Sequence, residues 1–130
     1  MKIKKINSIA FPFVLDLLSG PDYYVKPMFG CHAIYKDEKI LIILRNKNDS
    51  ISADKESNGV WIATEFDHHD SLIQIFPCLR DIKILSPKGN KTAWQMIPSS
   101  ADSFEEDVAL LCQMILKGDK RIGKIPNRKR

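Results

Sequence analysis

A run of five apolar residues at positions 40–44, Ile-Leu-Ile-Ile-Leu, limits the possible folds of this chain more than any other segment. Such a short, largely β-branched run without polar positions is typical of a central strand that is covered on both faces of a sheet. Residues 31–36 are a second candidate strand, and only Asp37 and Glu38 separate them from residues 39–45, which contain the apolar run. This two-residue spacing predicts an antiparallel hairpin, although the dipeptide lacks the glycine that a tight hairpin turn favours.

The segments on either side of this hairpin predict a mixed α+β fold. Residues 8–19 are expected to form a first helix, residues 23–28 an extended edge segment, and residues 60–64 a third strand. A short helix over residues 67–76 and a second hairpin over residues 81–97 follow. A capping box of Ser103 and Glu106 begins the last helix, which Gly118 ends. The predicted order is a helix, a three-stranded antiparallel meander, a helix, two strands and a helix.

Length and charge distribution predict one domain with a basic extension. The chain has 130 residues, of which 44% are hydrophobic, and this profile is typical of a single soluble domain. We therefore expect residues 1–118 to form the α+β domain and residues 119–130 to form a basic C-terminal tail. The net charge of +4 is unevenly spread, since the body is acidic while residues 117–130 hold seven cations and one acid. Ile122 and Ile125 hint that part of this tail packs.

The basic extension is the candidate nucleic-acid site. A dense run of cations attracts phosphates through counterion release, without reading a base edge. In the alternative interpretation, the tail only keeps the protein soluble, and some of its cations pair with acids of the body such as Glu105 or Asp107. The candidate residues are Lys117, Lys120, Arg121, Lys124, Arg128, Lys129 and Arg130.

The N-terminus and the cysteines indicate a cytoplasmic protein. The basic start and the apolar residues after it resemble a secretory signal, but Pro12 and Asp16 interrupt the apolar stretch and no cleavage site follows. Cys31, Cys78 and Cys112 are odd in number and lack a CxxC spacing, which favours a reducing compartment. No apolar stretch approaches the roughly 20 residues of a membrane-spanning helix, so no membrane contact is expected.

No group of residues in the sequence forms a convincing catalytic or metal site. Cys31 and His32 are neighbours on a predicted strand, so they point to opposite faces. His68 and His69 lie in the first turn of a predicted short helix, where such polar residues occur without a catalytic role. A zinc site that adds Cys31, Cys78 or Glu65 to these histidines is a remote alternative. The aromatic residues, including Trp61 and Trp94, are expected to pack in the core, and no cofactor is expected.

One segment resembles a known family. The sequence Lys-Pro-Met-Phe-Gly at residues 26–30, followed by Ala33-Ile34-Tyr35, the Asp37-Glu38 turn and the apolar strand, is similar to the N-terminal domain of the TfoX/Sxy competence-regulator family. Cys31 stands where that family has a second glycine, and residues 91–94, Lys-Thr-Ala-Trp, are similar to a strand of the YjbR-like proteins. The resemblance covers about residues 26–45. It implies a small α+β domain of the secretion-chaperone-like type without catalytic residues.

These observations together predict a small cytoplasmic, non-enzymatic binding or regulatory domain, with weak nucleic-acid affinity through the basic tail. Two alternatives stay open: a dimeric protein-binding or chaperone-like module, and a small enzyme that uses His68 and His69. A homodimer is expected because the predicted helices at both ends of the chain are apolar on more sides than one core requires.

Overall fold

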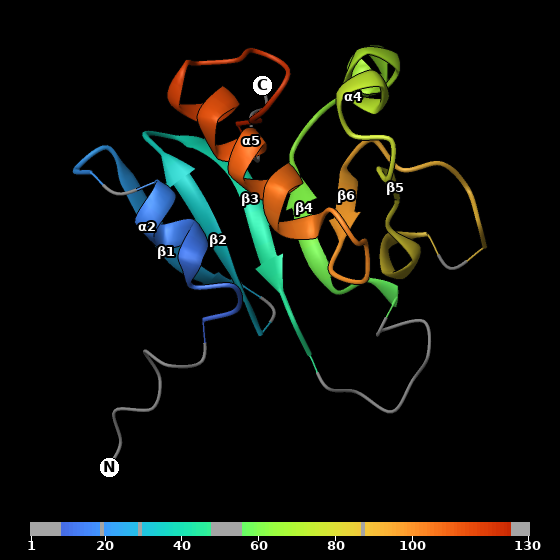
Figure 1. Cartoon of the computed structure of the whole chain (residues 1–130), viewed down its shortest axis with the longest axis horizontal. Helices are drawn as coiled ribbons and strands as arrows, with labels where there is room; N and C mark the ends of the chain where they lie inside the picture. Colours follow the sequence, from blue (N-terminus) through green and yellow to red (C-terminus); the bar gives the residue numbers. More distant parts are fainter. Residues whose placement is uncertain (1–8, 19, 29, 48–55, 87, 126–130) are drawn as a thin grey trace.

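The computed structural model describes residues 9–18, 20–28, 30–47, 56–86 and 88–125. These residues form a mixed α+β fold in which a six-stranded antiparallel sheet carries helices on one side (Figure 1). Neighbouring strands in the sheet follow the order β1-β2-β3-β4-β6-β5. The strands are β1 Tyr23–Met28, β2 Cys31–Lys36, β3 Lys39–Arg45, β4 Gly59–Ile62, β5 Arg80–Asp81 and β6 Gln95–Pro98.

The hairpin of β2 and β3 is confirmed, and β3 lies inside the sheet with both faces buried. Asp37 adopts the positive φ of 56° that the turn requires in place of a glycine. The register shifts between Ile34 and Tyr35, because Tyr35 pairs with Ile40 whereas Ile34 pairs with Ile42. Leu41 is thus the extra residue of a bulge, and the alternation of side chains between the two faces changes at this point.

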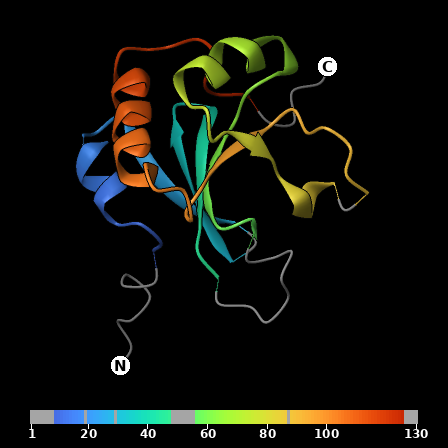
Figure 2. The same ribbon diagram turned by 45° about the vertical axis from the view of Figure 1, so that its right-hand side comes forward.

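Three α-helices accompany the sheet: α2 Phe13–Leu17, α4 His69–Ile75 and α5 Phe104–Leu116. Figure 2 shows α2 and α5 side by side against one face. The ring of Phe104 lies 4.9 Å from that of Phe11 and 6.5 Å from that of Phe13, so the N-terminal apolar residues and α5 cover each other. No helix in the described ranges is long and apolar enough to cross a membrane.

The first helix is shorter than the sequence predicts. It begins after Pro12, which serves as N-cap, and Phe11 has a positive φ of 50° that a continuous helix over residues 9–18 does not allow. Residues 8 and 19 of the predicted helix lie outside the described residues. The N-terminal helix therefore has five residues and buries mainly Val14 and the adjoining Leu18.

The second predicted hairpin is also corrected. Its strands β5 and β6 do pair, but β5 has two residues and a 3-10 turn, η2 Lys83–Leu85, follows it. Residues 82–94 therefore leave the sheet and return before β6, which lies between β4 and β5. The short helix α4 likewise begins later than expected, after the 3-10 turn η1 Phe66–His68, and Asp67 provides no side-chain cap.

The last helix has the predicted ends, but its N-terminal side chain bonds differently from a capping box. Ser103 Oγ donates to Asp107 Oδ2 at 2.7 Å instead of capping a backbone amide. At the C-terminus, Gly118 has a φ of 76°, and the amides of Gly118 and Asp119 donate to the carbonyls of Ile115 and Met114. This bonding pattern is a Schellman motif, which ends the helix and turns the chain back over the sheet.

The chain stays folded beyond residue 118. Ile122 is 2% exposed and belongs to the core on the helix-covered face. Lys124 and Ile40 exchange both backbone hydrogen bonds, at 2.8 and 2.9 Å, and the amide of Gly123 donates to the carbonyl of Ala63. We call residues 119–125 the C-terminal segment. The expected boundary at residue 118 is therefore corrected, because this segment packs on the body through residue 125.

Candidate functional site

The face of the sheet away from α2 and α5, here called the open face, carries the second hydrophobic cluster of the protein. Alternation along the strands places Cys31, Ala33 and Tyr35 of β2 on this face, next to Ile43 of β3 and Trp61 of β4. Ile82 belongs to this cluster, and Ile84 and Trp94, which also come from the yellow and orange segments in Figure 2, pack against it. None of the described residues in the cluster belongs to an α-helix, so in the described part of the chain the open face is apolar and has no helix layer.

A pocket of about 300 Å³ lies in this face. Strands β1 to β4 supply its floor, and residues 82–94 supply a wall through Leu85 and Trp94. Among the described residues, none of its lining side chains is charged, and the indole nitrogen of Trp61 already donates to the carbonyl of Ser57 at 2.8 Å. The pocket thus accepts an apolar group. Its lining residues are Met28, Tyr35, Ile40, Ile43, Trp61, Leu85 and Trp94.

A group of buried and part-buried hydrogen bonds fixes the wall of this pocket to the sheet. Asp81 Oδ1 accepts the amide of Thr92 at 3.1 Å and the side-chain amide of Gln95 at 2.6 Å. Thr92 Oγ1 accepts from the amide of Ile82 at 3.1 Å and donates to the carbonyl of Trp94 at 2.7 Å. These bonds join both ends of residues 82–94, so the position of Trp94 does not depend on its own contacts alone.

The ionisation of Asp81 fits this bonding role. Burial by itself would raise the pKa of Asp81, but the donors from Thr92 and Gln95 and the charge of Lys91 outweigh burial and hold the pKa below its usual value. The carboxylate is therefore charged at neutral pH. His69 supports the same region, since its Nε2 lies 2.7 Å from the carbonyl oxygen of Ala93.

The rim of the pocket on the β1 side is aromatic and basic. Tyr24 is 44% exposed and stacks on Tyr35, with the ring centroids 5.4 Å apart and the planes inclined by 13°. Lys26, two residues further along β1, is exposed, and its Nζ lies 5.1 Å from the centre of the Tyr35 ring. Because Tyr35 also lines the pocket, Lys26 is a charged group beside an apolar site.

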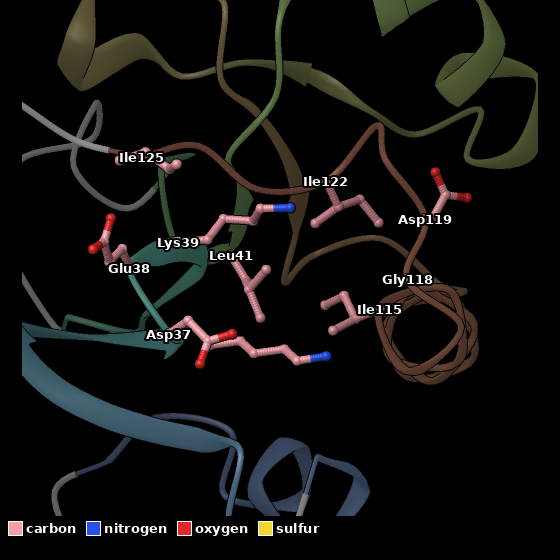
Figure 3. A pocket seen from close by; sticks show the side chains of 10 residues that line it. Asp37, Glu38, Lys39, Leu41, Ile115, Gly118, Asp119, Ile122 and Ile125 are labelled. Atoms are coloured by element: carbon pink, nitrogen blue, oxygen red, sulfur yellow. The ribbon is translucent and has the colours of Figure 1, made fainter. Parts of the chain in front are cut away.

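A second cavity, of about 400 Å³, lies between the β2–β3 turn, the end of α5 and the C-terminal segment (Figure 3). Ile115 and Ile122 converge on Leu41 at its floor. Two lysines and three acidic residues surround this floor, so the charges at its mouth are of both signs and do not favour either a cation or an anion. The charged lining residues are Lys36, Asp37, Glu38, Lys39 and Asp119.

The thiols lie apart from one another and stay protonated near neutral pH. Cys31 is buried in the open face, and burial raises its pKa although Lys47 and Arg45 act against this effect. Burial and the hydrogen bond to Asp107 raise the pKa of Cys78 to about 11, and burial raises that of Cys112 to about 12. Among the described residues, no three His, Cys, Asp or Glu side chains meet in a group that would hold a metal ion.

The described residues of the predicted basic tail differ in their surroundings. Lys117 is the C-cap of α5 and is exposed, as is Lys120. Arg121 bonds to Asp119 at 2.6 Å, which lowers the pKa of Asp119, and Arg121 also reaches Ser71 of α4. Lys124 pairs with Glu65 at 3.3 Å. Lys124 is thus paired with an acid of the body, whereas Arg121 is paired within the C-terminal segment, and neither ion pair involves Glu105 or Asp107. Arg128, Lys129 and Arg130 lie outside the described residues.

Sequence reasoning missed the pocket because its residues come from four strands and from the segment of residues 82–94. The aromatic residues were expected to serve core packing, and Trp61, at 8% exposure, does so. A signal was present in residues 59–63, Gly-Val-Trp-Ile-Ala, because successive apolar positions indicate a strand that is buried on both faces. It did not reveal the position of residues 82–94, which supply the wall of the pocket.

Comparisons of the chain with protein-family models, with curated proteins and with solved structures found no match. The similarity of residues 26–45 to the competence-regulator family therefore stays a prediction.

Proposed function

We propose that the protein is a non-enzymatic binding domain that holds a small apolar ligand in the pocket of the open face. The single observation that carries this proposal is the pocket itself, whose apolar lining includes three aromatic residues, among them both tryptophans of the chain. Ligand pockets are typically apolar concave sites with a few polar groups at defined positions. Such a domain acts by binding, as expected from a sequence without a catalytic group.

The volume of the pocket indicates the size of the ligand. An apolar cavity of about 150 Å³ holds benzene, and this pocket has about 300 Å³. It therefore suits a body of two fused or linked rings, or a branched aliphatic group of similar size. A planar body also fits the indole and phenol rings of the lining, because aromatic rings stack favourably at offset positions.

The chain provides its own reporters for a binding test. It contains two tryptophans, and both line the pocket. Titration of the ¹⁵N-labelled protein with 2-naphthamide, a neutral two-ring compound, should shift both indole N–H signals in a saturable manner. If neither indole signal responds to 2-naphthamide or to the anionic analogue 2-naphthoate, the proposal is wrong.

A matched pair of variants distinguishes this pocket from unspecific adsorption. Leu85 and Leu116 are both 51% exposed, but only Leu85 lines the pocket. We expect Leu85→Ser to weaken 2-naphthamide binding about tenfold, because the ligand no longer covers a leucine side chain at the wall. Leu116→Ser, on α5, should leave binding unchanged. Equal weakening in both variants would contradict a site on the open face.

A further inference from the structure

The ligand pocket has an asymmetric charge environment. Alternation along β1 places Tyr24, Lys26 and Met28 on the open face, where Lys26 pairs with Ala33. Met28 and Tyr35, which flank this position, both line the pocket. Lys26 therefore stands at the pocket's edge between two of its lining residues.

The side chain of Lys26 is already held in a defined place. Its Nζ lies 5.1 Å from the centre of the Tyr35 ring, a cation–π distance. Tyr24 in turn stacks on Tyr35 and donates its hydroxyl hydrogen to the carbonyl of Asp37. Because these contacts restrict the lysine before any ligand arrives, less conformational entropy is lost on binding. Within the described part of the chain, no carboxylate lies within 4 Å of this ammonium group.

Further cations stand near the same end of the pocket. Lys47 and Arg45 both act on Cys31, which pairs with Met28 across the β1–β2 ladder. Arg45 belongs to β3 and donates to Asn58 Oδ1 at 2.6 Å, which fixes its guanidinium. The acids of the β2–β3 turn, Asp37 and Glu38, lie at the opposite end of the hairpin. Cations therefore stand near the Met28 end of the pocket, and the acids of this turn stand away from it.

We propose that the ligand of this pocket is an amphipathic anion, an aromatic or branched apolar body with one carboxylate, and that Lys26 binds its negative charge. This inference rests on the proposed function and adds the polar half of the ligand to it. The apolar body would lie among the seven lining side chains, and the carboxylate would emerge at the β1 rim, where water still reaches it. In this arrangement Lys26 positions the ligand and selects its charge.

A comparison of two nearly isosteric compounds tests the proposal. 2-Naphthoate and 2-naphthamide share the ring system and differ in charge, so the ratio of their dissociation constants isolates the contribution of the carboxylate. From the indole N–H shifts at low salt, we expect 2-naphthoate to bind about fivefold more tightly, as a partly exposed ion pair allows. Raising the salt concentration to about 1 M should reduce this ratio toward one.

A lysine on the other face of the β1–β2 strand pair serves as the control. Lys36 of β2 also lies over a tyrosine ring, with its Nζ 5.9 Å from the centre of Tyr23, but does not line the apolar pocket. In Lys26→Gln the preference for 2-naphthoate over 2-naphthamide should disappear. In Lys36→Gln the preference should persist.

The outcomes separate this inference from the proposed function. If 2-naphthamide binds and 2-naphthoate binds no better, the anion preference is wrong but the apolar site stands. A preference that survives in Lys26→Gln would assign the charge recognition to another group and overturn the role of Lys26. If neither compound binds, the proposed function itself fails.

Discussion

Gly59, at the start of β4, occupies a position that no other residue fits. Its φ is 150°, and an added Cβ would lie 2.1 Å from the carbonyl oxygen of Ile97 on the neighbouring strand. We expect Gly59→Ala to lower the free energy of unfolding by about 3 kcal/mol, because both the backbone and β6 must shift. Gly89 is the control: it also has a positive φ, of 88°, but nothing lies near its added Cβ. Urea denaturation should show a clearly smaller loss for Gly89→Ala.

Asp81 gives the stability a dependence on pH. Hydrogen bonds hold the pKa of Asp81 in the folded protein below its usual value. The charged carboxylate therefore stabilises the folded protein above about pH 4, and this stabilisation is lost as the pH falls through the pKa of the folded state. Asp81→Asn keeps the shape but removes the charge. We expect this variant to be about 1–2 kcal/mol less stable at neutral pH. Chemical denaturation at several pH values should show that this difference shrinks below about pH 4, and a constant difference would contradict the assignment.

At the scale of helices and strands, the sequence predicts best those elements that depend on a single local signal. The apolar run of β3 and the two-residue turn identified the β2–β3 hairpin, and Gly118 identified the end of α5. The first helix was predicted too long because its apolar composition hid the break that Phe11 and Pro12 make. The pocket of the open face was not predictable from the sequence, because it depends on where residues 82–94 lie after they leave the sheet. Hydrogen bonds from Thr92 and Gln95 to Asp81, which is more than ten residues away in the sequence, determine that position.

The C-terminal segment changes how the basic residues must be tested. Deletion of residues 119–130 would remove Ile122 from the core and the pairing of Lys124 with Ile40. We expect this deletion to cost more than about 3 kcal/mol of stability, as the loss of a buried isoleucine does. Deletion of residues 126–130 instead spares these interactions, and thermal unfolding should show a melting temperature close to that of the full chain.

The shorter deletion also tests the predicted nucleic-acid affinity. It removes Arg128, Lys129 and Arg130 but leaves Lys117 and Lys120, which are exposed. If the basic residues bind phosphates, retention of a labelled duplex at low salt should fall in the shortened protein. For the shortened protein, the slope of log K for duplex binding against the logarithm of the salt concentration should also become less steep, by about 0.9 for each phosphate that is no longer neutralised. If both proteins retain the duplex equally, these three cations do not contribute to nucleic-acid binding.

At the scale of the whole molecule, the packing of α2 on α5 bears on the predicted dimer. The rings of Phe11, Phe13 and Phe104 cover one another within one chain, so the apolar N-terminal residues do not require a second copy. Leu17 and Leu110 remain exposed, at 39% and 40%. The symmetric dimer stays a prediction: light scattering coupled to size exclusion should give twice the mass of 14.9 kDa, and Leu110→Ser should then shift the protein toward the monomer.

The pairing of Ile40 with Lys124 also has a consequence for kinetics. Most of the chain lies between these two residues, so the unfolded chain must close a long loop before the pair contributes any energy, whereas the β2–β3 hairpin closes across two residues. The C-terminal segment should therefore dock after the rate-limiting step of folding. In stopped-flow experiments, Ile122→Val should then accelerate unfolding and leave the refolding rate unchanged. The segment would thus determine how long the native state persists rather than how quickly it is reached.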